Sequence, residues 1–67
     1  MQRIRFIYWA HTNPSEPSRL FKKKGDALEW GRQAYAGLFI VEPIAMTKLS
    51  ERVDYIRSAL GYHVTPA

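Results

Sequence analysis

Apolar and polar side chains alternate at the start of the chain. The odd-numbered positions begin with two basic residues and end with Ile7 and Trp9. The even-numbered positions are apolar throughout: Ile4, Phe6, Tyr8 and Ala10. This alternation of branched and aromatic residues predicts a strand. Residues 12–18 contain two prolines among small polar residues and predict a loop. Residues 19–23 then predict a short second strand, antiparallel to the first.

A helical pattern follows Gly25 and Asp26. Asp26 is a candidate N-cap, and Glu29 stands three residues later, as in a capping box. Gly31 would cost roughly 1 kcal/mol inside a helix, so we expect it to be a point of close approach to the sheet. The helix is expected to end at residues 36–37, and its buried face to comprise Ala27, Leu28, Gly31, Ala34 and Tyr35.

The second half of the chain predicts one more strand and one more helix. Residues 38–41 form a continuous apolar run, typical of a strand buried on both faces. Pro43 cannot donate to a ladder and breaks this strand at an edge or a bulge, with residues 44–46 as an alternative extension of it. Thr47 or Ser50 is the expected cap of the second helix, and Gly61 is its expected stop. The apolar stripe of that helix consists of Leu49, Val53, Ile56 and Leu60.

These elements predict an α+β fold in a single domain spanning residues 1–67. The order is β-β-α-β-α, with a small three-stranded, mostly antiparallel sheet and one or two packed helices. Residues 62–67 are expected to form a tail. A chain of 67 residues buries only about 60% of its unfolded surface, so its stability is marginal.

The positive charge is concentrated in the first third of the chain. Residues 1–24 hold six bases and one acid, giving +5, whereas residues 25–67 hold four bases and five acids, giving −1; together these make the net charge of +4. Such an asymmetry is informative about partners rather than fold. The densest cluster, Lys22, Lys23 and Lys24, either contacts phosphates or is a solvated strand end that blunts an edge.

Arg3, Arg5 and Trp9 are expected to share one face of the first strand. Bases interleaved with an aromatic ring are typical of a sheet that stacks nucleic-acid bases. The alternative is that the second helix covers Ile7 and Trp9, because an exposed pair would form a costly apolar patch. If the helix packs elsewhere, this face is the best candidate interface.

Trp30 and Arg32 lie on the first helix, away from its predicted buried face. Tryptophan and arginine are enriched at binding hot spots, so both are candidate partner-binding residues. The alternative is that Trp30 widens the buried stripe together with Ala34.

Motifs for catalysis or metal binding are missing from the sequence. It contains no cysteine, and its two histidines, His11 and His63, have no neighbouring nucleophile or second ligand. We expect both histidines at the surface, no catalytic residue, no metal and no cofactor. No apolar run approaches the roughly 18 residues that span a bilayer, so a cytoplasmic protein without membrane contact is expected.

The stretch from Ile4 to Met46 resembles certain very small phage proteins that take over host machinery. It is similar in size and element order to the podovirus inhibitor of bacterial RNA polymerase. The resemblance is carried by Asp26–Trp30, followed by Ala36–Gly37 and Phe39–Val41. The helix after Thr47 departs from that pattern, and no polymerase-contacting residue can be matched. The resemblance therefore implies a class, a small non-enzymatic protein that binds and blocks, and not a target.

Function is therefore expected to lie in binding rather than in catalysis. The leading hypothesis is a phage or mobile-element inhibitor or modulator in the cytoplasm of a bacterial host, which occludes a surface of a larger host protein sterically or electrostatically. One alternative is a nucleic-acid-binding module that uses the basic hairpin. Another is a homodimeric interaction protein. The candidate partner-binding residues are Arg3, Arg5, Trp9, Lys22, Lys23, Lys24, Trp30 and Arg32.

Overall fold

The N-terminal hairpin forms as its alternating pattern predicts. The computed structural model describes residues 3–67, in which β1 (Phe6–His11) pairs antiparallel with β2 (Pro17–Phe21). The connecting loop is ordered by Asn13, whose carbonyl accepts the Glu16 N–H and whose side chain accepts the Ser15 N–H, both at 3.1 Å. The expected second strand, 19–23, lies two residues earlier, because the chain turns into a helix after Phe21.

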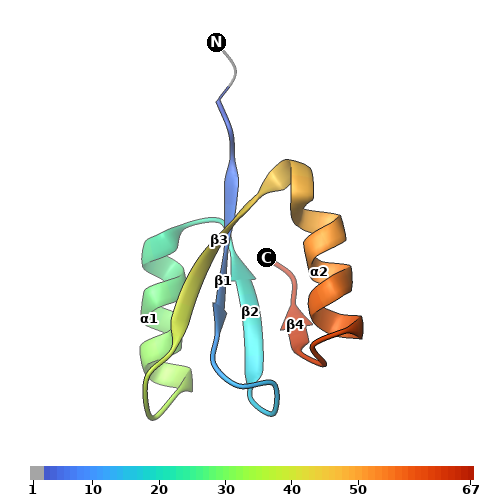
Figure 1. Cartoon of the computed structure of the whole chain (residues 1–67). Coiled ribbons are helices and arrows are strands. Elements are labelled where there is room, and N and C mark those ends of the chain that lie inside the picture. The colour runs from blue at the N-terminus through green and yellow to red at the C-terminus, as the bar shows by residue number, and fades with distance from the viewer. Residues whose placement is uncertain (1–2) are drawn as a thin grey trace.

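The hairpin is the centre of a four-stranded mixed sheet with the order β3-β1-β2-β4 (Figure 1). β3 (Ile40–Ala45) runs antiparallel beside β1, and β4 (His63–Thr65) runs parallel beside β2. The α+β class is confirmed, but the predicted three-stranded sheet is wrong in detail. The element order is β-β-α-β-α-β, with a short 3-10 turn, η1 (Met46–Lys48), before the second helix.

The fourth strand lies in the segment expected to be a tail. β4 is held to β2 by Ser18, whose hydroxyl donates to the His63 carbonyl at 2.7 Å, and Ser18 is itself buried. Arg57 donates to the Val64 carbonyl at 2.7 Å, and the Val64 side chain joins the core. Gly61, at φ +75°, makes the turn that brings the chain back from the helix, as expected of a glycine stop.

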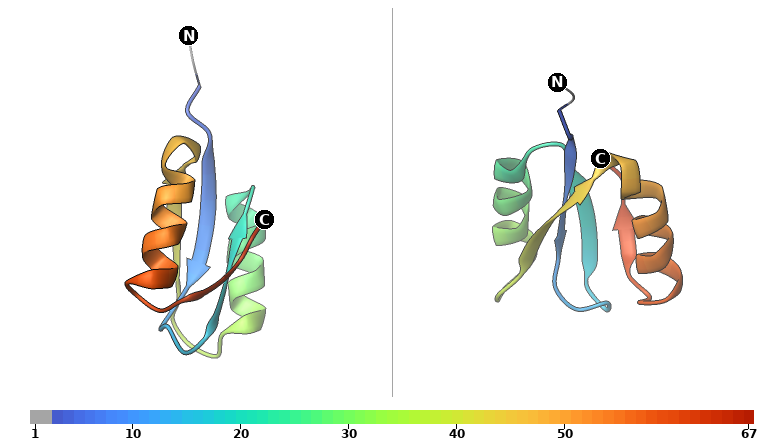
Figure 2. Two further views of the ribbon diagram at one scale, coloured as in Figure 1. Left: turned by 90° about the vertical axis from the view of Figure 1, so that its right-hand side faces the viewer. Right: turned by 45° about the horizontal axis from the view of Figure 1, so that its top comes forward.

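The two helices cover opposite faces of the sheet. α1 (Lys24–Ala34) and α2 (Leu49–Ser58) lie on either side of it when the sheet is viewed edge-on (Figure 2, left). Side chains of successive strand residues point to opposite faces. The Ile7–Trp9–His11 side of β1 therefore faces α2, and the Tyr8–Ala10 side faces α1.

α2 covers the face that carries Ile7 and Trp9. Val53 and Ile56 of its predicted stripe pack against both residues in the main core, whose other members are Leu20, Ile44 and Val64. Leu49 packs at the border of this core, whereas Leu60 remains exposed. Neither Thr47 nor Ser50 caps the helix as expected, since Lys48 occupies the N-cap position without a side-chain bond.

α1 begins two residues before the predicted cap. Lys23 is at the N-cap position without a side-chain bond, so Asp26 lies in the first turn, where the helix dipole favours an acid. Ala27 and Gly31 are buried as expected, but Ala34 is exposed. A Cβ on Gly31 would overlap the ring of Phe39, so the close approach expected at this glycine is to the residue before β3 and not to the sheet itself.

β3 is an edge strand and is not buried on both faces as predicted. Leu38 precedes it and is 96% exposed, and Ile40 is 58% exposed. The strand also continues through Pro43. The Met46 N–H donates to the Arg5 carbonyl at 2.9 Å, so by alternation the backbone of Pro43 faces away from β1. Pro43 therefore costs the ladder no hydrogen bond and removes a donor from the free edge, consistent with the predicted edge position.

Candidate binding surface at the end of the hairpin

Five of the predicted partner-binding bases lie at one end of the hairpin. β1 begins where β2 ends, because the two strands are antiparallel with Tyr8 opposite Phe21. Arg3 and Arg5 on the segment entering β1 are therefore carried to the same end as the lysine run that leaves β2, Lys22, Lys23 and Lys24 (Figure 1). All five side chains are exposed.

The lysine run lies there because β2 is diverted into α1. Lys23 would stand opposite Phe6 if β2 continued, but the ladder stops at the Tyr8–Phe21 pair. The Lys23 carbonyl instead accepts the Ala27 N–H at 3.2 Å, the first bond of α1. The start of β1 consequently has a strand neighbour on only one side, β3.

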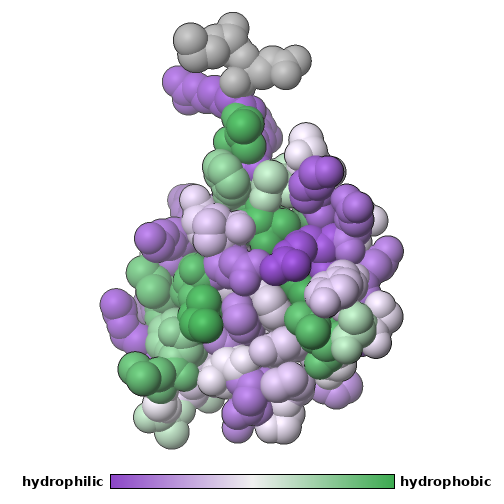
Figure 3. All heavy atoms as spheres, in the orientation of Figure 1, coloured by the Kyte–Doolittle hydropathy of each residue, from purple (hydrophilic) through white to green (hydrophobic). Residues whose placement is uncertain are grey.

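Three apolar side chains lie exposed beside these bases. Ile4 is 69% exposed, Phe6 42% and Met46 46%, and Met46 is held next to Arg5 by its backbone bond. Figure 3 shows hydrophobic and hydrophilic residues side by side in the segment that projects beyond the sheet. We call these eight residues the hairpin-end surface: Arg3, Ile4, Arg5, Phe6, Lys22, Lys23, Lys24 and Met46.

A groove opens within the hairpin-end surface. Its volume is about 380 Å³, and it is lined by Arg5, Phe6, Ile7, Tyr8, Lys22 and Met46. The floor is apolar and aromatic, while Arg5 and Lys22 supply positive charge. Sequence reasoning missed the apolar part, because it identified Ile4 and Phe6 only as members of the apolar face of the first strand. α1, which covers the face that carries Phe6, begins only at Lys24 and does not extend over the start of β1 (Figure 2, left). A period of two carries no signal for where a covering helix ends.

Trp9 does not belong to this surface. It is 2% exposed, and its ring stacks on that of His11 at 3.6 Å between centroids. The ring of Tyr62 meets it edge-on at 4.8 Å. The alternative that the second helix covers Ile7 and Trp9 is therefore correct, and the Trp9 ring is not accessible to a partner in this fold.

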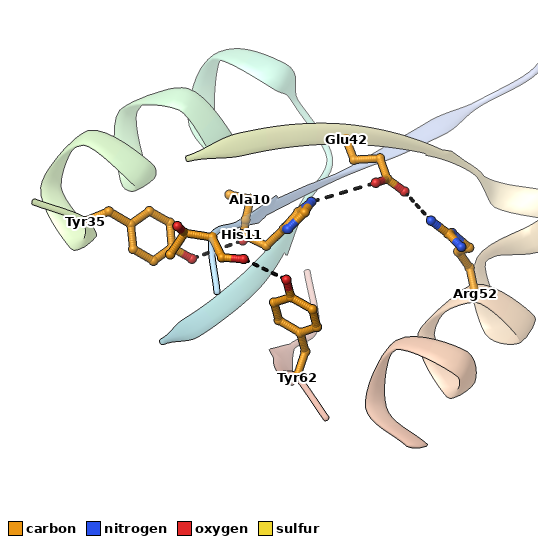
Figure 4. Close-up of polar contacts among 7 residues, drawn as sticks. Ala10, His11, Tyr35, Glu42, Arg52 and Tyr62 are labelled. Atoms are coloured by element: carbon orange, nitrogen blue, oxygen red, sulfur yellow. Dashed lines mark hydrogen bonds and ion pairs between the residues drawn. The ribbon is translucent and has the colours of Figure 1, made fainter. Parts of the chain in front are cut away.

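His11 is buried beside Trp9, contrary to the expectation of a surface histidine. Its Nε2 lies 3.8 Å from the Glu42 carboxylate, which also pairs with Arg52 of α2 at 2.8 Å (Figure 4). Tyr62 closes the cluster by donating from its hydroxyl to the Thr12 carbonyl at 2.7 Å. This cluster ties β1, β3 and α2 together, with the His11 ring buried and the Glu42–Arg52 pair partly exposed. His63, in contrast, is exposed as expected.

Burial sets the protonation of this cluster. It lowers the pKa of His11 below its ordinary 6.5, and the nearby Glu42 carboxylate opposes that effect. The neutral ring suits an apolar site between two aromatic rings. Both of its nitrogens and the Trp9 indole nitrogen are buried without a hydrogen-bond partner among residues 3–67. The hydrogen bond with Glu42 raises the pKa of Arg52, so that side of the cluster stays charged.

Trp30 and Arg32 lie apart from the hairpin-end surface. Trp30 is half-buried, with its ring 5.7 Å from that of Phe21 and 5.4 Å from that of Tyr35, so it widens the packed face of α1. Arg32 is exposed in the last turn of that helix. Eight residues at 1.5 Å rise place it roughly 12 Å along the axis from Lys24.

Tyr35 anchors the other end of α1 to the sheet. Its hydroxyl donates to the Ala10 carbonyl at 3.3 Å (Figure 4). The same hydroxyl also donates to the Pro17 carbonyl. Burial, with a smaller contribution from Glu16, raises the pKa of Tyr35 to about 12. The hydroxyl is therefore a dedicated donor at neutral pH.

Within residues 3–67, no cluster of three His, Cys, Asp or Glu side chains is placed to hold a metal ion. None of the helices in that range is both long and apolar enough to cross a membrane. Comparison of the chain with protein-family models, curated proteins and solved structures finds no match.

Proposed function

We propose that this chain is a small binding protein without an activity of its own, which blocks a surface of a larger protein. The observation that carries the proposal is the hairpin-end surface, where exposed apolar side chains lie among five bases. A protein interface typically combines apolar anchors with a polar rim. The positive rim fits an acidic patch on the partner and steers association.

The apolar side chains that lie among the five basic residues favour a protein partner over nucleic acid. Stacking on nucleic-acid bases uses exposed aromatic rings, and Trp9 is only 2% exposed. Phe6, 42% exposed, is the single aromatic residue among the eight of the hairpin-end surface. Ile4 and Met46 are aliphatic and fit a protein pocket instead. The homodimer is disfavoured at the β3 edge, since Pro43 removes a donor there. By resemblance, the partner belongs to a bacterial host and this chain to a phage or other mobile element, acting in the host cytoplasm.

The test is capture of a partner from bacterial lysate by the immobilised full chain and matched variants. We expect one stoichiometric protein, retained by the wild type and at least tenfold reduced by Phe6→Ser and by Arg5→Glu. Two controls change the same kinds of residue elsewhere: Leu38→Ser removes an apolar side chain that is 96% exposed, and Arg32→Glu reverses an exposed base. Both controls are expected to capture the partner normally.

Two results would contradict the proposal: no stoichiometric partner, or equal loss in all four variants. Nucleic acid is tested separately with short single- and double-stranded DNA and RNA at low and moderate salt. Tight binding that weakens steeply with salt would establish the nucleic-acid reading in place of the protein one.

A further inference from the structure

The start of β1 has an unpaired backbone edge inside the hairpin-end surface. Backbone groups along an antiparallel strand face its two neighbours alternately. The hydrogen bond from the Met46 N–H to the Arg5 carbonyl shows that the backbone N–H and C=O groups of odd-numbered residues in this segment face β3. The N–H and C=O groups of Phe6, and by continued alternation those of Ile4, therefore face the opposite side, where β2 would run.

That side is open because β2 has already turned away. The β1–β2 ladder begins at Tyr8, and no backbone bond joins Phe6 to Lys23 in the part of the chain described here. Lys23 has its carbonyl bound within α1. The groove of about 380 Å³ lies along this stretch, with Lys22 on its border.

We infer that the hairpin-end surface binds an extended segment of the partner as an added strand beside residues 4–6. Such strand addition combines main-chain hydrogen bonds with pockets for alternate side chains. The inference rests on the proposed function and names the partner's recognition element.

The side chains of β1 specify the pattern of that segment. The alternation of β1, extended back through the segment that enters it, assigns Ile4 and Phe6 to one face of the sheet and Arg3 and Arg5 to the other. A strand added beside them presents its own side chains to the same two faces. Apolar residues then meet Ile4 and Phe6, and acidic residues meet the two arginines. The occupant is therefore an extended segment in which acidic and apolar residues alternate.

The first test uses two synthetic eight-residue peptides, acetylated and amidated, each with four glutamates and four valines. One alternates the two residues, and the other places them in two blocks. Binding to the full chain is followed by NMR chemical shifts. We expect the alternating peptide to bind at least fivefold more tightly, with new protection of the Phe6 amide from exchange. Equal affinities, or no binding of either peptide, would overturn strand addition.

The second test removes single backbone donors. Ile4→Pro deletes an N–H that faces the open side, whereas Ile4→Ala deletes a similar side chain and keeps the N–H. Residue 4 precedes β1 and is 69% exposed, so the fold tolerates both changes. We expect Ile4→Pro to bind the alternating peptide at least fivefold more weakly than Ile4→Ala. Equal binding by the two variants would contradict the inference.

N-methylation of the peptide gives an independent readout. Only alternate N–H groups of a strand face one neighbour. Methylation of one set, either the four valine nitrogens or the four glutamate nitrogens, should therefore abolish binding, and methylation of the other set should not. Equal effects would overturn the inference. The proposed function has a separate outcome. If a partner is captured in a way that depends on Arg5 and Phe6, but the two peptides bind equally, the hairpin-end surface remains the binding site and strand addition is ruled out.

Discussion

The two halves of β1 continue one alternating pattern in opposite surroundings. In the C-terminal half, Trp9, Ala10 and His11 are buried, with strands on both sides and a helix on each face. In the N-terminal half, Phe6 is 42% exposed and has a strand on one side only. The covered half accounts for its apolar residues through stability. In the open half Ile7 also belongs to the core, but the exposed ring of Phe6 does not, and it is therefore available to a partner.

The largest expected difference between the two halves is the cost of removing an aromatic ring. Trp9→Ala should destabilise the fold by about 3–5 kcal/mol, because it leaves a cavity between the sheet and α2. Small domains have only about 5–15 kcal/mol in total, so much of this variant would be unfolded. Urea denaturation followed by circular dichroism measures the loss. A change below about 1 kcal/mol would show that Trp9 is not a core residue.

Tyr62 tests how firmly the covered half is closed. Tyr62→Phe keeps the ring against Trp9 and removes the 2.7 Å bond to the Thr12 carbonyl. We expect a loss of about 1 kcal/mol, as for a single neutral hydrogen bond. Thermal unfolding by calorimetry gives the value. A variant as stable as the wild type would place the hydroxyl in solvent.

The buried histidine predicts a pH dependence that originates in the covered half. Burial lowers the pKa of His11 in the fold below its ordinary 6.5, so the unfolded chain binds the proton more readily. Stability should be fully present above about pH 6.5 and should fall as the pH drops through the lower, folded pKa.

Urea midpoints between pH 7.5 and 5 measure this dependence. His11→Phe should flatten the profile over that range, whereas His63→Gln, which changes an exposed residue, should retain it. A profile unchanged in His11→Phe would place the titrating group elsewhere.

The smallest effect on stability is expected in the open half. Phe6→Ala removes a ring that is already 42% exposed, so it should cost less than about 1 kcal/mol, several times less than Trp9→Ala. The same denaturation experiment compares the two. If both substitutions cost the same, the open half is part of the core and the contrast between the halves fails.

The sequence predicted the elements that have a clear period. The alternation from Ile4 to Ala10 predicted β1, and the spacing of Val53 and Ile56 predicted the face of α2. The sequence did not decide whether the second helix covers Ile7 and Trp9, because periodicity identifies the apolar face of an element but not what packs on it. The sequence also predicted the position of the basic residues in the hairpin, since antiparallel strands bring Arg5 and Lys22 to the same end.

The parts that the sequence missed depend on tertiary contacts. Strand β4 has only three residues and no period of its own; it is held by pairing with β2, and Ser18 and Arg57 also bind its carbonyls. The run at 38–41 is apolar enough for a central strand, yet it leads into an edge strand. His11 is buried by the rings of Trp9 and Tyr62, which no local pattern indicates.

The most direct test of the contrast is amide hydrogen exchange of the free chain, followed residue by residue by NMR. The Ile7 N–H faces β3 and the Tyr8 N–H faces β2, so both should exchange slowly. The Phe6 N–H faces the open side and should exchange at close to the unprotected rate. A Phe6 amide as slow as those of Ile7 and Tyr8 would show that this side of β1 is already covered, and would contradict the account.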